Sequence, residues 1–155
     1  MGARRDQDGW NQSHDPDREA ADVLAYLDHL ADGKAGLAGE LVAHVDLYGV
    51  VTSTIALDGG SELYLQAGDG WDRVLWTCPT GRTYEWTWRP EETPGDLNAL
   101  LAGRGIERTT LVQRRLVGAQ LIVDDRTLTV AEGRWRLALI QRMGLSSRIQ
   151  ERPAR

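Results

Sequence analysis

The segment WTCPTGRTYEWTW, residues 76–88, contains three of the six tryptophans, one of the four tyrosines and the only cysteine of the chain. Aromatic and β-branched residues lie on both sides of Pro-Thr-Gly, which is typical of two strands joined by a tight turn. A two-residue turn at residues 80–81 would place Trp86 and Trp88 on one face of this hairpin and Trp76 on the other, more polar face. The segment therefore predicts a β-hairpin whose tryptophans form either a core or an exposed binding surface.

The segments that precede this hairpin repeat its pattern of strand residues separated by turn residues. Asp-Gly-Gly-Ser and Gly-Asp-Gly stand between them, and both favour hairpin connections. Short turns of this kind join antiparallel strands. The sequence thus predicts an antiparallel meander of four strands, which cover residues 48–57, 62–67, 71–78 and 82–89.

Helices are predicted at three places along the chain. Asp15 is a suitable N-cap and Pro16 suits the first helical position, so a helix with an apolar face is expected over residues 16–32. A short helix is expected from Pro94 onward. A third is expected over residues 134–143, although the alternation of apolar residues there also fits a strand.

The remaining segments are less regular. Residues 109–117 fit either a helix or a strand, and residues 120–130 form a weaker hairpin pattern. The predicted fold class is α+β, with an antiparallel meander sheet of four to six strands covered on one face by the N- and C-terminal helices. We expect residues 1–15 to be flexible, residues 16–145 to form a single domain, and residues 146–155 to form a loose basic tail.

Composition and charge limit the classes of function. The chain has 155 residues, no phenylalanine and a net charge of −5. Residues 1–103 carry 7 basic and 18 acidic side chains, whereas residues 104–155 carry 11 basic and 5 acidic ones. The basic C-terminal third therefore either pairs with the acidic remainder or offers a surface to nucleic acid or an acidic partner. A single cysteine excludes a disulfide within the chain.

The expected compartment follows from the N-terminal residues and from hydropathy. The stretch MGARRDQDGW lacks the apolar run of a signal peptide. No stretch of the sequence approaches the length of an apolar transmembrane helix. We therefore expect a cytoplasmic protein that does not act at a membrane.

No pattern of residues indicates catalysis. The three histidines, His14, His29 and His44, lack the spacing of metal ligands. Cys78 precedes Pro79 at the end of a predicted strand, where no helix N-terminus lowers the pKa of its thiol. The glycine-rich turns match neither a phosphate-binding loop nor a calcium loop. We expect no cofactor, no metal and no catalytic residue, which favours a function other than catalysis.

The leading hypothesis is a small interaction or regulatory protein that binds another protein, as regulators, chaperone-like proteins and immunity-type proteins do. Tryptophan is enriched among the residues that dominate binding energy at protein interfaces, and acidic residues flank the predicted turns. The predicted contacts are Trp10, Asp69, Trp71, Asp72 and Trp76. Replacing Trp71 or Trp76 by alanine would then weaken binding without unfolding the protein.

Two other functions stay open. In the first, nucleic acid binds the basic C-terminal third, which ends in a degenerate helix-turn-helix-like segment around Gly144. The predicted phosphate contacts are Arg114, Arg115, Arg134, Arg136, Arg142 and Arg148. In the second, a small ligand or substrate binds in a pocket between the sheet and a helix.

Overall fold

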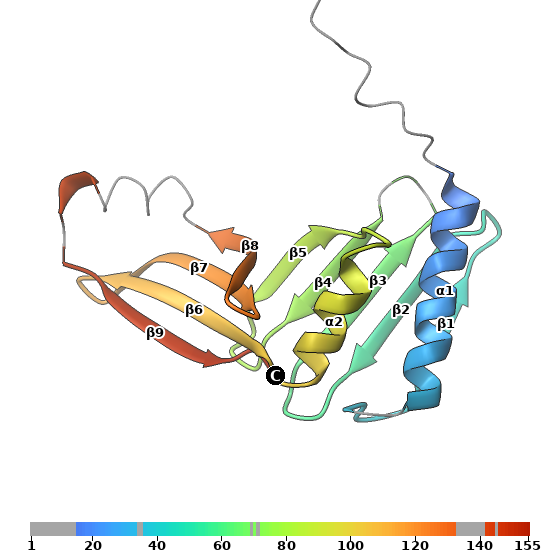
Figure 1. Cartoon of the computed structure of the whole chain (residues 1–155), viewed down its shortest axis with the longest axis horizontal. Coiled ribbons are helices and arrows are strands. Elements are labelled where there is room, and N and C mark those ends of the chain that lie inside the picture. The colour runs from blue at the N-terminus through green and yellow to red at the C-terminus, as the bar shows by residue number, and fades with distance from the viewer. Residues whose placement is uncertain (1–14, 34–35, 69, 71, 133–141, 145) are drawn as a thin grey trace, which may run out of the picture.

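The computed structural model describes residues 15–33, 36–68, 70, 72–132, 142–144 and 146–155 (Figure 1). Within these residues the chain forms two antiparallel sheets, and both helices lie over one face of the first sheet. The helices are α1 (Pro16–Gly33) and α2 (Thr93–Leu101). The first sheet contains β1 (Ala43–Val45), β2 (Val51–Ala56), β3 (Glu62–Ala67), β4 (Arg73–Thr77) and β5 (Thr83–Thr87). The second contains β6 (Gly105–Val112), β7 (Arg115–Val123), β8 (Arg126–Glu132) and β9 (Arg148–Pro153).

The first sheet is a meander in which β1 to β5 lie in chain order, so the predicted α+β class and antiparallel meander are confirmed. Residues alternate between a buried and a more exposed face along β2, β3 and β4, as expected for a sheet that is covered on one side. The main core lies between this face and the helices. Its largest fully buried apolar side chains are Leu27, Ile55, Leu63, Leu65, Trp76, Tyr84, Leu97 and Leu100.

The two helices meet above the sheet through Tyr26 of α1. Its hydroxyl donates a hydrogen bond to Oδ1 of Asn98 in α2 at 3.1 Å. Its ring lies 5.6 Å, centroid to centroid, from that of Trp88, which is buried at the end of β5. Aromatic pairs in such tilted arrangements stabilise a core beyond the area they bury. Tyr26 therefore joins α1, α2 and the first sheet.

The turn between β4 and β5 differs from the predicted one. Cys78 and Arg82 are hydrogen-bonded across it, which leaves a three-residue loop rather than a two-residue one. Gly81 has a φ of +83°, which glycine adopts without steric cost. The pairing therefore shifts by one residue, and Trp76 lies opposite Tyr84. Because a shift of one residue exchanges the faces of a strand, Trp76 belongs to the covered face, and its predicted place on the polar face is wrong.

The later strands do not extend the meander but form the second sheet, in the order β8-β7-β6-β9. β6 and β7 occupy the uncertain segment and are joined by Gln113 and Arg114, both with positive φ. Asp124 and Asp125 make the corresponding turn between β7 and β8, as the weaker hairpin pattern predicted. In Figure 1 the second sheet lies beside the first, next to the end of β5.

Residues 148–153 form β9 and pair with β6 from Leu111↔Arg148 to Ile106↔Pro153. The predicted loose tail is therefore an ordered edge strand over most of its length. This strand also replaces the second helix of the predicted helix-turn-helix-like end, so that motif is absent from the described residues. The expected helix over residues 134–143 lies almost wholly outside the described residues, as does the expected flexible segment up to residue 14.

Candidate functional site

The predicted protein-contact residues do not form one exposed surface. Trp76 is fully buried, and Asp72 is 5% exposed. The Asp72 carboxylate accepts a hydrogen bond from the N–H of Gly68 at 3.0 Å, so it stabilises the turn between β3 and β4. Trp76 and Asp72, both predicted as protein contacts, are therefore buried side chains in this structure. Trp10, Asp69 and Trp71 lie outside the described residues, and their role in binding stays a prediction.

A different apolar surface lies at the β1–β2 end of the first sheet. We call it the apolar tip and define it as Val42, Val45, Leu47 and Tyr48. Leu47 is 101% exposed and Tyr48 is 88% exposed, and the two valines are about half exposed. Large apolar side chains exposed together are typical of interaction sites, whereas single ones are common on any surface.

The backbone of the apolar tip is held by hydrogen bonds to Asp46. Oδ1 of Asp46 accepts from the N–H of Tyr48 at 2.8 Å and from the N–H of Val50 at 2.9 Å. The Asp46 carbonyl accepts from Gly49 at 3.1 Å. An aspartate that bonds the following backbone in this way fixes a turn. Leu47 and Tyr48 are therefore presented on an ordered turn, which lowers the entropy lost when a partner binds.

The sequence contains a signal for this surface that the neighbouring strand pattern obscures. In Val-Asp-Leu-Tyr-Gly, residues 45–49, an aspartate and a glycine enclose two large apolar residues. The predicted strand over residues 48–57 begins at Tyr48 because the residues after it alternate. Asp and Gly at that spacing instead indicate a turn, and apolar residues within a turn are exposed.

The charges around the apolar tip are acidic. Asp46 lies between Val45 and Leu47 in the chain, and Glu40 is an exposed residue shortly before Val42. β1 is also an edge strand that pairs only with β2 among the described residues. A partner can therefore reach both the side chains of the tip and the outer side of β1.

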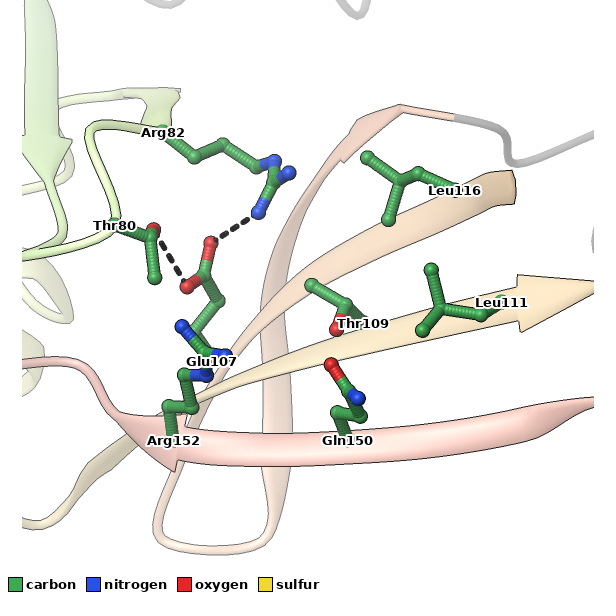
Figure 2. Close-up of a pocket in the computed structure, with 8 residues that line it drawn as sticks. All are labelled: Thr80, Arg82, Glu107, Thr109, Leu111, Leu116, Gln150 and Arg152. Atoms are coloured by element: carbon green, nitrogen blue, oxygen red, sulfur yellow. Dashed lines mark hydrogen bonds and ion pairs between the residues drawn. The ribbon is translucent and has the colours of Figure 1, made fainter. Parts of the chain in front are cut away.

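The second feature is a polar cluster where the two sheets meet, formed by Glu107, Thr80, Arg82 and Tyr84. We call it the Glu107 cluster. The Glu107 carboxylate is 1% exposed and accepts hydrogen bonds from Thr80 Oγ1 at 2.7 Å and from Arg82 Nη1 at 2.7 Å (Figure 2). It accepts a third hydrogen bond from Tyr84 OH at 3.0 Å. Burial, followed by the charge of Glu107, raises the pKa of Tyr84 well above its usual range, so its hydroxyl remains a donor. The cluster therefore links β6 to the β4–β5 hairpin.

A cavity of about 200 Å³ opens beside the Glu107 cluster. We call it the junction cavity, because β6, β7, β9 and the β4–β5 turn all contribute to it. Besides Thr80 and Glu107, its lining residues are Arg82, Thr109, Leu111, Leu116, Gln150 and Arg152. Figure 2 shows Arg82 approaching Glu107 from one side, with Arg152 and Gln150 on β9 at the other. No sequence motif indicated this cavity, since its residues converge from four separate segments.

Cys78 lies under the β4–β5 turn and is 1% exposed. Burial, and then the charge of Glu107, raises the pKa of its thiol from 9.0 to about 12. At neutral pH the thiol is therefore protonated and enclosed, which is unsuitable for a nucleophile. Cys78 therefore serves as a small buried side chain of the core.

The raised pKa of Cys78 predicts a loss of stability at alkaline pH. Above pH 9.0 the thiol ionises in the unfolded state but stays protonated in the folded state up to about pH 12. The unfolded state then binds fewer protons, so the free energy of unfolding falls as the pH rises, by at most about 1.4 kcal/mol per pH unit for this group. Urea unfolding between about pH 9 and pH 10 should show a slope that rises toward this value, and Cys78→Ala should reduce it. An equal slope in the original chain and in Cys78→Ala would show that Cys78 does not cause this loss of stability.

The arginines predicted to bind nucleic acid are partly brought together. Arg114 and Arg148 line a second cavity of about 430 Å³ at the far end of the second sheet. Arg115 and Arg142 are exposed. The other two predicted contacts, Arg134 and Arg136, lie outside the described residues, so a nucleic-acid interface stays a prediction.

Metal ligands and membrane spans are absent from the described part of the chain. It contains no group of three or more His, Cys, Asp or Glu residues that is arranged to hold a metal ion. Among the same residues, no helix is both long and apolar enough to cross a membrane. Comparison of the chain with protein-family models, with curated proteins and with solved structures gave no match.

Proposed function

We propose that this chain acts by binding another protein through the apolar tip, in a regulatory rather than a catalytic role. One observation carries the proposal: Leu47 and Tyr48 are 101% and 88% exposed on a turn held by hydrogen bonds to Asp46. Exposing two large apolar side chains to water is unfavourable unless a partner covers them. Tyrosine is also among the residues that contribute most at protein interfaces.

The charge around the apolar tip indicates what kind of partner it fits. Asp46 and Glu40 are exposed, and residues 1–103 as a whole carry an excess of 11 acidic side chains. A second copy of the chain bound tip to tip would bring like charges together, as would an anionic membrane surface. The tip therefore favours a different protein, with an apolar pocket for Leu47 and Tyr48 and a basic rim around it.

The double variant Leu47→Ala/Tyr48→Ala tests this proposal. We expect it to bind the partner at least about thirtyfold more weakly, because a single central apolar or aromatic contact already contributes about 2 kcal/mol or more. Its free energy of unfolding should change by less than about 0.5 kcal/mol, as for other exposed side chains. The partner is first captured from an extract of the protein's own cells, before and after nuclease treatment. Affinity is then measured by calorimetry with both purified proteins.

The matched control is Ile149→Ala, which removes an apolar side chain that is 58% exposed on β9 of the second sheet. Equal binding by this variant and the original chain, with loss of binding by the double variant, supports the proposal. A partner that binds the double variant unchanged overturns it. Self-association that depends on Leu47 would assign the tip to a second copy. Capture that disappears after nuclease treatment would favour the predicted arginine interface.

A further inference from the structure

The junction cavity contains polar side chains for which the described residues provide no partner. Among the described residues, Thr80, Arg82 and Tyr84 are engaged with Glu107, whose carboxylate is thereby satisfied. Arg152 lies directly opposite Glu107 in the pairing of β6 with β9, yet it is exposed and forms no ion pair within the described part of the chain. One guanidinium group is therefore available to a ligand.

Two further polar groups flank Arg152 on the same face of the second sheet. Thr109 and Gln150 lie opposite each other, two residues further along β6 and β9, and both line the junction cavity. Residues two apart on a strand share one face. The Cα atoms of Thr109 and Gln150 therefore lie about 7 Å along the strands from those of Glu107 and Arg152.

The charge of the junction cavity favours a ligand with a single negative charge. Its charged lining residues are Arg82, Arg152 and Glu107, which together leave an excess of one positive charge. The ion pair of Arg82 with Glu107, at 2.7 Å, already neutralises two of these three charges. A monoanion at Arg152 would balance the third, and guanidinium groups match the planar geometry of a carboxylate.

The size and the apolar wall of the cavity define the rest of the ligand. Leu111 and Leu116 are paired across β6 and β7, and both line the cavity beyond Thr109. Its volume of about 200 Å³ is below the range of roughly 300–1,000 Å³ typical of pockets for drug-sized ligands. A short apolar stem therefore fits between the leucines.

From this arrangement we propose that the junction cavity binds a small molecule with one carboxylate group on a short apolar stem. The carboxylate accepts hydrogen bonds from Arg152, and the stem packs against Leu111 and Leu116. Thr109 and Gln150 hydrogen-bond any polar substituent between the two. This site is separate from the apolar tip, so its test does not depend on the proposed protein partner.

The test uses hexanoate as the probe, with hexanamide as a neutral molecule of the same length. Binding to the full chain is followed by calorimetry and by NMR chemical shifts. We expect saturable binding of hexanoate, and binding of hexanamide that is weaker by about tenfold or more, because hydrogen bonds to a charged group are the stronger ones. Acetate should bind more weakly than hexanoate, since it lacks a stem to cover the leucines.

Arg152→Gln is the decisive variant because Arg152 is exposed and does not hold Glu107. It should weaken hexanoate binding by about tenfold or more and bring it close to that of hexanamide. The control is Arg108→Gln, which removes an arginine from the opposite face of β6, where it pairs with Glu151. That variant should bind hexanoate as the original chain does.

Several results would overturn the proposal. If hexanoate at about 10 mM does not bind, its dissociation constant lies well above about 1 mM. That result would show that the junction cavity is not a site for this ligand class. Equal binding of hexanoate and hexanamide, or an unchanged affinity in Arg152→Gln, would do the same. Tighter binding of inorganic phosphate than of hexanoate would assign the cavity to a different class of anion.

Discussion

Replacing Glu107 by alanine is expected to lower the free energy of unfolding by about 3–5 kcal/mol, the range found when one partner of a buried ion pair is removed. Three donors lose their acceptor in this variant: Thr80, Arg82 and Tyr84. Tyr84 is fully buried, so water cannot easily replace the carboxylate at its hydroxyl. The measurement is urea unfolding of the variant and the original chain at neutral pH.

Glu151→Ala is the matched control for this prediction. Glu151 also pairs with an arginine, Arg108, at 2.6 Å, but the two side chains are 46% and 38% exposed. Exposed pairs of this kind contribute about 0–1 kcal/mol, so this variant should unfold almost as the original chain does. If the two variants lose similar amounts of stability, the Glu107 cluster does not hold the sheets together as we infer. Glu107→Gln keeps the side-chain volume and one acceptor, so its free energy of unfolding should lie between those of Glu107→Ala and Glu151→Ala.

Replacing Trp76 by alanine is expected to cost about 3–5 kcal/mol of unfolding free energy, as for other large aromatic residues removed from a core. Trp76 is fully buried, and its Nε1–H donates a hydrogen bond to the carbonyl of Ala154 at 2.8 Å. Ser61 donates to the same carbonyl at 3.0 Å. The variant thus loses both core volume and a link between the first sheet and the residue that follows β9.

Two phenylalanine variants separate these contributions. Trp76→Phe keeps most of the volume but loses the hydrogen bond, which should cost about 1–2 kcal/mol. Trp88→Phe is the control, because Nε1 of Trp88 is buried and has no acceptor among the described residues. Losing that N–H costs little, so only the change in volume remains. Urea unfolding that leaves Trp76→Ala within about 0.5 kcal/mol of the original chain would restore Trp76 as a surface residue.

Glu107→Ala and Trp76→Ala both remove contacts at the place where the two sheets join. Glu107 of β6 is bound to the β4–β5 hairpin, while Ala154 accepts hydrogen bonds from the first sheet and donates its own N–H to the carbonyl of Gly105 at 3.0 Å. Gly105 approaches Leu100 so closely that a Cβ at this position would collide with Leu100 Cδ2. The junction is therefore closely packed around these groups, and the junction cavity lies at its edge.

Much of the secondary structure could be predicted because its signals are local. The predicted helix over residues 16–32 matches α1, and the predicted strand at residues 62–67 has the bounds of β3. Capping residues, apolar periodicity and turn glycines each act within a few residues of where they occur. The β6–β7 hairpin is harder to predict because its turn lacks the usual local signal. Gln113 and Arg114 form this turn with positive φ, whereas glycine or asparagine usually occupies such positions.

The candidate sites were harder to predict. The sequence of residues 76–88 left core and binding surface open for Trp76, whereas in the structure Trp76 is fully buried and Leu47 is fully exposed. A residue's type indicates its tendency to be buried, but its burial depends on register and on which elements cover the strand. Arg152 and Glu107 are 45 positions apart, and no local pattern connects them.

An α+β chain with an antiparallel meander and an N-terminal helix could be predicted from the sequence, which contains no recognisable catalytic motif. The burial of Trp76, the pairing of residues 148–153 with β6 and the second sheet formed by the later strands became apparent only in the folded chain. The difference follows from the range of the interactions. Propensity and turn chemistry act between neighbours in the chain, whereas register, sheet pairing and burial depend on the free energy gained when distant segments pack together.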